Sequence, residues 1–135
     1  MEPGPTLALV VLAVHDLARA TRFYREIFGW PQTVDAPVYA ELLMPDGRRL
    51  GLYVADAYGR NTGISPTLPP PQGVSPAELY FQTDDPATLL ERLRAAGARV
   101  LSPLAPRAWG DEAAYVADPD GHVIVAARPL PSPPR

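Results

Sequence analysis

The 135-residue chain contains no cysteine and only two histidines. The absence of cysteine excludes disulfides, thiolate metal sites and a cysteine nucleophile, and it fits the reducing cytoplasm, where we expect the protein to reside. The histidines, His15 and His122, are too few for a histidine-rich metal site. We expect His15 at the end of a strand beside a helix cap, and His122 in a hydrogen-bonded turn.

Neither an excess of basic charge nor a long apolar run is present. The formal net charge is −3, so nothing points to nucleic acid as a partner. The apolar stretch LALVVLAV (7–14) is too short to cross a bilayer, and Glu2 rather than a basic residue precedes it. We therefore expect a buried strand here, and no membrane or nucleic-acid partner.

Proline, by contrast, is abundant, with 18 residues. Many of them lie in two segments, ISPTLPPPQGVSP (64–76) and RPLPSPPR (128–135). The first segment predicts an extended linker between two halves of the chain. The end of the second, residues 129–135, predicts a disordered or surface-bound tail.

The rest of the sequence states one pattern twice. In the first copy, the strand 7–14 is followed by Asp16 as a helix N-cap, a helix with apolar side chains at helical spacing, and Gly29 as its end. In the second copy, the strand 78–83 is followed by Asp85 as the cap, and Gly97 ends the helix. Nearly equal separations between the two caps and between the two glycines indicate a duplicated module.

Each copy continues with a Pro-Asp-Gly turn, at 45–47 and at 119–121, that leads into an alternating strand, 48–54 and 122–127. Each half therefore reads βαβββ. This predicts an α+β fold in one domain, with modules at about 7–58 and 77–128. Two such sheets can bury the faces that their helices leave bare by curling into a cup, with the helices outside and a pocket inside.

The sequence resembles the vicinal oxygen chelate superfamily, which includes glyoxalase I, extradiol dioxygenases and bleomycin-resistance proteins. The matching segments are VVLAVHDLARATRFYREIFGW and MPDGRRLGL in the first half, and LYFQTDDPATLLERLRAAGARV and WGDEAAYVADPDGHVIV in the second. The resemblance covers about residues 7–128 and implies a homodimer. A dimer is also expected because two helices cover two sheets incompletely.

The resemblance also implies where a metal would bind. Metal-dependent members place ligands at the first residue of each opening strand and at the fifth residue of each last strand. The corresponding residues here are Leu9, Gly51, Glu78 and Val125. Only Glu78 has a donor atom, whereas catalytic sites usually supply about three protein ligands. We therefore expect no metal cofactor, although a divalent ion at an atypical site stays an alternative.

Glu78 is the candidate catalytic residue. Strand alternation directs it into the cup with Tyr80 and Gln82, while Leu79 and Phe81 face the helix. A carboxylate in an apolar cup has a raised pKa unless it is paired, so Glu78 could act as a base or anchor a cationic or hydrogen-bonding ligand. The structural alternative is an ion pair at the rim with Arg48, Arg49 or Arg107.

Aromatic side chains are expected to line the pocket, because aromatic walls bind flat or cationic molecules. Gly51 is expected to leave room for a larger guest. Glu41, near Tyr39, is expected to face solvent or the rim. The predicted ligand-binding residues are Tyr39, Tyr53, Tyr80, Gln82, Trp109 and Tyr115.

Three functions fit this pattern. The preferred one is a protein that binds a small organic molecule without the family metal, as bleomycin-resistance proteins sequester a drug. The second is a glyoxalase-like lyase, isomerase or dioxygenase that uses Glu78 as a base or within an atypical metal site. The third is a protein-interaction module whose proline-rich segments form the contacts. Whether the protein is an enzyme stays open at this point.

Overall fold

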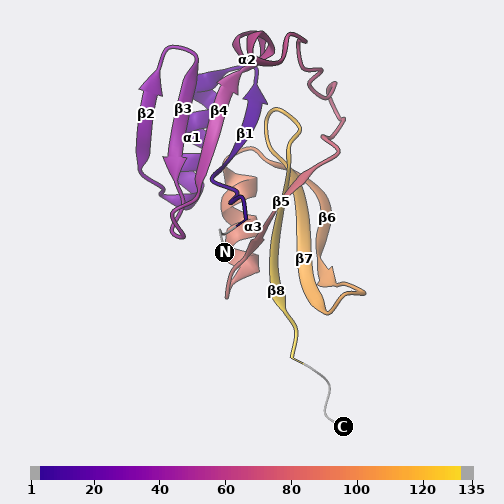
Figure 1. The fold of residues 1–135 in the computed structure, drawn as a ribbon. Helices are drawn as coiled ribbons and strands as arrows, with labels where there is room; N and C mark the ends of the chain where they lie inside the picture. Colours follow the sequence, from indigo (N-terminus) through magenta and orange to yellow (C-terminus); the bar gives the residue numbers. More distant parts are fainter. Residues whose placement is uncertain (1–3, 132–135) are drawn as a thin grey trace. The chain divides into compact units, whose positions relative to one another are not determined.

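The computed structural model describes residues 4–131 (Figure 1). The chain divides into two compact units, Met1–Leu68 and Pro69–Arg135, which we call the first and second modules. Each module has a four-stranded mixed sheet and a helix that follows its first strand. The predicted α+β fold with two βαβββ modules is therefore confirmed.

The first module contains one sheet with the strand order β1-β4-β3-β2. β1 pairs with β4 in parallel, and the other two pairings are antiparallel. Its elements are β1 (Leu9–Val14), α1 (Leu17–Phe28), β2 (Gln32–Ala36), β3 (Tyr39–Leu43), β4 (Arg49–Val54) and α2 (Ala55–Thr62).

The ends of α1 are set by the two residues that the sequence indicates. The Asp16 carboxylate accepts a hydrogen bond of 3.0 Å from the Arg19 amide. Gly29 adopts a φ of 67° and donates its amide to the Arg25 carbonyl at 2.8 Å. Between these ends, α1 buries one apolar face, which with three leucines of the sheet forms the module's core; these residues are Ala20, Phe23, Tyr24, Ile27, Leu42, Leu50 and Leu52.

The second module repeats the arrangement with the strand order β5-β8-β7-β6. Asp85 caps its helix by accepting a 3.1 Å hydrogen bond from the Thr88 amide, Pro86 occupies the first turn, and Leu93 is fully buried. The elements are β5 (Glu78–Gln82), α3 (Pro86–Ala95), β6 (Arg99–Pro106), β7 (Asp111–Ala117) and β8 (Val123–Pro129).

The two Pro-Asp-Gly turns are built alike. Gly47 has a φ of 87° and donates to the Met44 carbonyl at 3.0 Å, and Gly121 has a φ of 89° and donates to the Asp118 carbonyl at 3.0 Å. Residues without a Cβ adopt this backbone conformation at little cost. The His122 amide donates to the Asp118 side chain at 2.9 Å, so His122 lies in the hydrogen-bonded turn that was expected.

One element was not predicted. Residues 55–62 form the short helix α2, where the sequence analysis ended the first module without a helix. Its sequence ADAYGRNT contains glycine, asparagine and threonine, which have low helix propensity, so no pattern marked it. Of the predicted proline-rich tail, residues 132–135 lie outside the described residues. No helix within residues 4–131 is long and apolar enough to cross a membrane.

Candidate functional site

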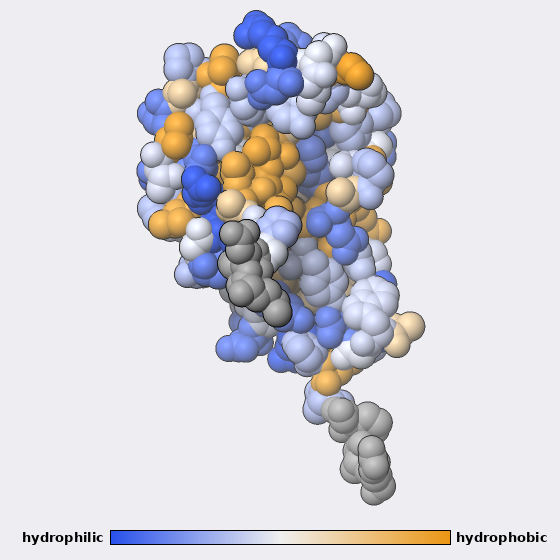
Figure 2. Space-filling model, in the orientation of Figure 1, coloured by the Kyte–Doolittle hydropathy of each residue, from blue (hydrophilic) through white to orange (hydrophobic). Residues whose placement is uncertain are grey.

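Each sheet has one face against its helix and one face that its helix leaves uncovered, which we call the helix-free face. In the first module, the fully buried Leu50 and Leu52 lie on the helix side of β4, so Gly51 and Tyr53 lie on the helix-free face. The strand register places Gly51 opposite Val11 of β1 and Glu41 of β3. Figure 2 shows an apolar area over the region of β1.

The space above Gly51 is filled by the protein's own Tyr39. A Cβ atom built on Gly51 would lie 2.6 Å from the Tyr39 hydroxyl oxygen, 2.9 Å from its Cε1 and 3.1 Å from Cδ1 of Leu9. Separations below 3.0 Å do not occur between such atoms without movement. The expectation that Gly51 leaves room for a larger guest is therefore wrong, because a neighbouring side chain occupies that room.

Glu41 holds Tyr39 in this place. The Tyr39 hydroxyl donates to Oε2 of Glu41 at 2.7 Å, and Arg49 Nη1 lies 2.8 Å from Oε1 of the same carboxylate. Glu41 is only 6% exposed, so the expectation that it faces solvent or the rim is also wrong. Burial and the adjacent Glu41 carboxylate raise the pKa of Tyr39, which keeps its hydroxyl protonated as a donor.

Tyr53 continues this network as an aromatic cluster. Its ring centroid lies 5.0 Å from that of Tyr39 and 5.8 Å from that of Tyr58 on α2, both distances typical of interacting aromatic rings. Tyr39 and Tyr53 are half-buried. The two predicted ligand-binding tyrosines of the first module therefore lie together, with Tyr39 bonded to Glu41 and Tyr53 packed on Tyr58.

On the helix-free face of the second sheet, the part formed by β5 is more open. β5 presents Glu78, Tyr80 and Gln82 there, all exposed, while Leu79 and Phe81 on the other face are half-buried. The Glu78 carboxylate forms no hydrogen bond or ion pair with any of residues 4–131. The three arginines considered as its partners are engaged within their own modules: Arg48 with Asp46, Arg49 with Glu41, and Arg107 with backbone carbonyls.

Tyr80 is the centre of a hydrogen-bonded group. Its hydroxyl donates to the Asp111 carboxylate at the start of β7 and accepts from the Trp109 indole Nε1 at 2.9 Å. Burial and the hydrogen bond to Asp111 raise the pKa of Tyr80. Trp109 is 56% exposed and Tyr80 36% exposed. The structure thus brings together two of the predicted ligand-binding residues and adds Asp111, a carboxylate that the prediction did not include.

Arg107 fixes the loop beside Tyr115. Its guanidinium donates to the Ala113 carbonyl from Nε at 3.1 Å and from Nη2 at 2.8 Å, and Nη2 also donates to the Ser102 hydroxyl and the Pro103 carbonyl at 2.8 Å each. The same guanidinium lies 5.1 Å from the centre of the Tyr115 ring. Tyr115 in turn packs on a buried apolar cluster made by Ala113, Val123, Val125 and Ala127.

The residues at the four positions where the family resemblance places metal ligands do not form a ligand set. Leu9, Gly51 and Val125 have no donor atoms in their side chains, and Tyr39 blocks the direction in which a side chain at position 51 would extend. Within residues 4–131, no three histidine, cysteine or acidic side chains lie close enough together to hold a metal ion. A single carboxylate, Glu78, holds a divalent ion only weakly.

Two residues of these networks, Glu41 and Asp111, were not among the predicted site residues. A signal for Glu41 was available. The turn at 45–47 fixes the β3–β4 register, which pairs Glu41 with Gly51 and Tyr39 with Tyr53. Using that register would have placed Tyr39 and Glu41 on the same face as Gly51.

Comparison with known proteins gives consistent matches over nearly the whole chain. The family model described as the Glyoxalase/Bleomycin resistance protein/Dioxygenase superfamily matches residues 6–126. An uncharacterized protein of Mycobacterium tuberculosis is 28% identical over 145 residues, which cover 96% of this chain and 82% of the relative.

Solved structures give the same result. A glyoxalase-related enzyme from Fulvimarina pelagi superposes with a TM-score of 0.79 at 29% identity, covering 91% of this chain and 87% of that protein. A glyoxalase/bleomycin resistance protein/dioxygenase from Nocardioides has a TM-score of 0.78 at 26% identity, covering 100% of this chain and 91% of its own. A lactoylglutathione lyase from Agrobacterium tumefaciens, at 20% identity and a TM-score of 0.71, shares the fold, with 93% of this chain and 95% of that chain covered.

Proposed function

We propose that this chain, which belongs to the Glyoxalase/Bleomycin resistance protein/Dioxygenase superfamily, binds a small organic molecule without the metal ion that the resemblance implies for metal-dependent members. The observation that carries the proposal is the filled position above Gly51. Where the family resemblance implies a ligand-bearing side chain, this chain has glycine, and Tyr39, Glu41 and Arg49 form a polar network beside it.

The second module supplies the groups for recognition. Glu78 and Gln82 are exposed on the helix-free face, and Tyr80 and Trp109 add two partly exposed aromatic rings. The acidic groups here are Glu78 and Asp111, whereas the cation Arg107 is committed to carbonyl oxygens and to Tyr115. This combination favours a flat ligand that is cationic or rich in hydrogen-bond donors.

An enzymatic function is the second candidate. It is favoured by one observation: the Glu78 carboxylate is exposed and unpaired among the described residues, as a general base must be before substrate binds. The glyoxalase-related enzyme from Fulvimarina pelagi adds an analogy at the level of fold. In this case Glu78 would remove a proton from a bound substrate.

A binding experiment tests the proposal. The probe is proflavine, a flat aromatic cation, and the signal is quenching of the indole fluorescence of Trp109. The variant Trp109→Phe shows how much of the fluorescence signal comes from that tryptophan. We expect saturable quenching that weakens in Glu78→Gln. Glu91→Gln, which removes an exposed carboxylate on α3, is the matched control and should bind like the parent protein.

Two results would contradict the proposal. One is quenching by proflavine that does not saturate or that is equal in Glu78→Gln. The other is equal affinity for an anionic aromatic probe, 1-anilinonaphthalene-8-sulfonate, since the acidic face should reject it. Loss of a proton-transfer activity in Glu78→Gln, with probe binding retained, would favour the enzymatic candidate.

We further propose that the protein is a cytoplasmic homodimer. The dimer follows from the family resemblance and from the incomplete cover that one helix gives each four-stranded sheet. Light scattering coupled to size-exclusion chromatography distinguishes a dimer from a monomer of 14.6 kDa.

A further inference from the structure

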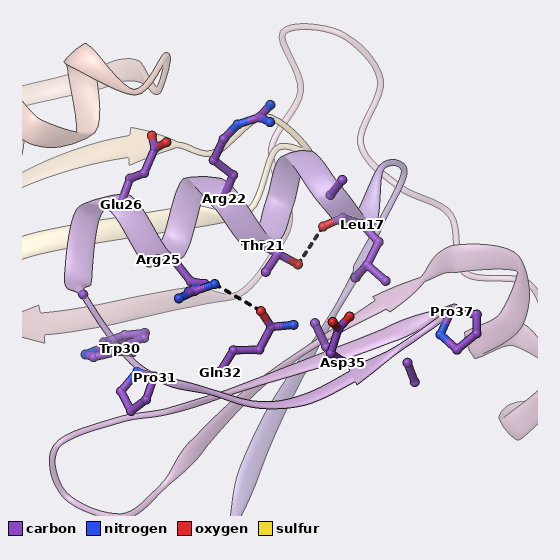
Figure 3. A pocket seen from close by; sticks show the side chains of 14 residues that line it. Leu17, Thr21, Arg22, Arg25, Glu26, Trp30, Pro31, Gln32, Asp35 and Pro37 are labelled. Carbon is purple, nitrogen blue, oxygen red and sulfur yellow. Dashed lines mark hydrogen bonds between the residues drawn. The ribbon is translucent and has the colours of Figure 1, made fainter.

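A hollow lies on the opposite side of the first sheet from Tyr39, between α1 and β2 (Figure 3). Its volume is about 830 Å³, within the range of small-molecule sites. The helix α1, the connection 29–31 and the strand β2 with its following turn line it. All of these belong to the first module, so this hollow is separate from the helix-free faces.

The hollow exists because small residues face each other across it. Ala18 and Gly29 line it from the helix side, and Ala36 and Ala40 line it from the sheet side. Ala40 is 2% exposed and leaves no bulk to fill the gap between the helix and the strand. Trp30 closes one end, stacked on Phe28 with ring centroids 4.2 Å apart, and is itself only 7% exposed.

Opposite charges lie at two places along this hollow. Near Trp30, Arg25 points across to Gln32 and donates a long hydrogen bond of 3.4 Å to its side-chain oxygen (Figure 3). Farther along, between Gln32 and Pro37, Asp35 points from β2 toward α1 (Figure 3). The Asp35 carboxylate has no hydrogen bond or ion pair with the residues that the structure describes.

The spacing of these two places defines the ligand. Thr21 and Arg25 are four helical residues apart, about 6 Å along α1. Gln32 and Asp35 pair with Leu42 and Ala40 of β3, which are two residues apart, so the bulge in β2 leaves them about 7 Å apart along the strand. We propose that this hollow binds an elongated zwitterion, with a carboxylate at Arg25, an amine at Asp35 and a short apolar chain between them. The ligand's opposite charges would lie roughly 6–7 Å apart, which excludes α-amino acids.

Two further charged residues border the hollow, and together they add no net charge to it. Arg22 and Glu26 also border it but point from α1 away from β2 (Figure 3), where they form a neighbouring pair of opposite sign on the helix surface. The hollow therefore carries no net excess of either charge. A singly charged ligand would satisfy one of the two places and leave the other carrying an unmatched group.

The test uses the full chain and 6-aminohexanoate as the probe, followed by amide chemical shifts in two-dimensional NMR. Hexanoate and hexylamine are the controls, each with one of the two charges. We expect saturable shifts confined to residues 17–40, and weaker binding of both controls. Arg25→Gln and Asp35→Asn should each weaken 6-aminohexanoate binding about three- to fivefold, the size expected for exposed ion pairs.

The matched controls are Arg94→Gln and Glu91→Gln, which remove the same kinds of charge from α3 and should leave binding unchanged. The amide spectrum of each variant shows directly that it is folded. The proposal is overturned if hexanoate or hexylamine binds as tightly as 6-aminohexanoate, if the shifts lie outside residues 17–40, or if no saturable shift occurs. None of these outcomes bears on proflavine binding by the second module.

Discussion

Replacing Gly51 with alanine should destabilise the protein, although alanine suits the backbone of a strand at this position. The added methyl would lie 2.6 Å from the Tyr39 hydroxyl and 2.9 Å from its ring. Tyr39 must therefore move, and its 2.7 Å hydrogen bond to Glu41 is lost or lengthened. The Glu41 carboxylate is buried, so it would then depend on Arg49 alone.

The magnitude follows from two opposing effects. Weakening a hydrogen bond to a charged group and displacing a packed ring cost about 2–4 kcal/mol in unfolding free energy. Alanine restricts the unfolded chain more than glycine does, which raises the free energy of unfolding by about 0.4–1 kcal/mol. The net loss of about 1–3 kcal/mol should lower Tm by roughly 4–10 °C for a domain of this size.

A double-mutant cycle separates this cause from a general sensitivity of β4. Denaturant unfolding would be measured for Gly51→Ala, Tyr39→Ala and the double variant. In the Tyr39→Ala background the clash is gone, so Gly51→Ala should be neutral or slightly stabilising, with a coupling energy of about 1 kcal/mol or more. Equal destabilisation by Gly51→Ala in both backgrounds would refute the claim that Tyr39 fills this position.

Three further outcomes are expected. Tyr39→Phe removes the hydrogen bond to Glu41 and should lower the free energy of unfolding by about 1–2 kcal/mol at neutral pH. Because the pKa of Tyr39 in the folded protein is raised above its ordinary 10.0, this stability difference should be full below pH 10 and shrink above it. Tm of the parent and the variant, measured from pH 8 to 11, would show the change. Asp85→Ala should remove the cap of α3. Hydrogen bonds from Thr88 lower the pKa of Asp85 below 3.8, so the cap's contribution to stability should be present above that pH and disappear in acid. Unfolding of the parent and the variant would be followed by circular dichroism from pH 2 to 6. A stability difference that stays the same over this range would contradict the expectation. Arg107→Met removes the hydrogen bonds to the Ala113 carbonyl and should lower the free energy of unfolding by about 1–3 kcal/mol, as measured with denaturant. An unchanged midpoint would show that these bonds are dispensable.

The secondary structure was predictable where one local interaction decides it. Asp16 and Asp85 cap helices by accepting hydrogen bonds from amides three residues later. The turns at 45–47 and 119–121 end in glycines with positive φ angles, which glycine adopts at less cost than other residues. These signals depend on near neighbours, so the repeated pattern revealed both modules. The helix α2 was not predicted, because it contains glycine, asparagine and threonine, which have low helix propensity. Contacts such as the Tyr53–Tyr58 ring pair accompany it.

The site was less predictable, because its geometry depends on pairs of residues from different strands. Alternation along β4 and β5 gave the correct face for Gly51 and Tyr80, but alternation within one strand does not show what lies across from it. The interpretation of Gly51 as open space failed because Tyr39 reaches it from β3. Asp111 was not among the predicted site residues, because its bond to Tyr80 joins positions 31 residues apart.

The central claim is the proposal that no ion binds at the positions where the family resemblance places metal ligands. Its most direct test is elemental analysis by mass spectrometry of the full chain, purified without chelator and dialysed against micromolar Zn²⁺, Ni²⁺, Mn²⁺ and Fe²⁺ in turn. We expect each metal to remain far below one equivalent per chain and to be unaffected by Glu78→Gln. One equivalent of any of them, lost in Glu78→Gln, would contradict the account and make this protein a metal-binding member of its superfamily.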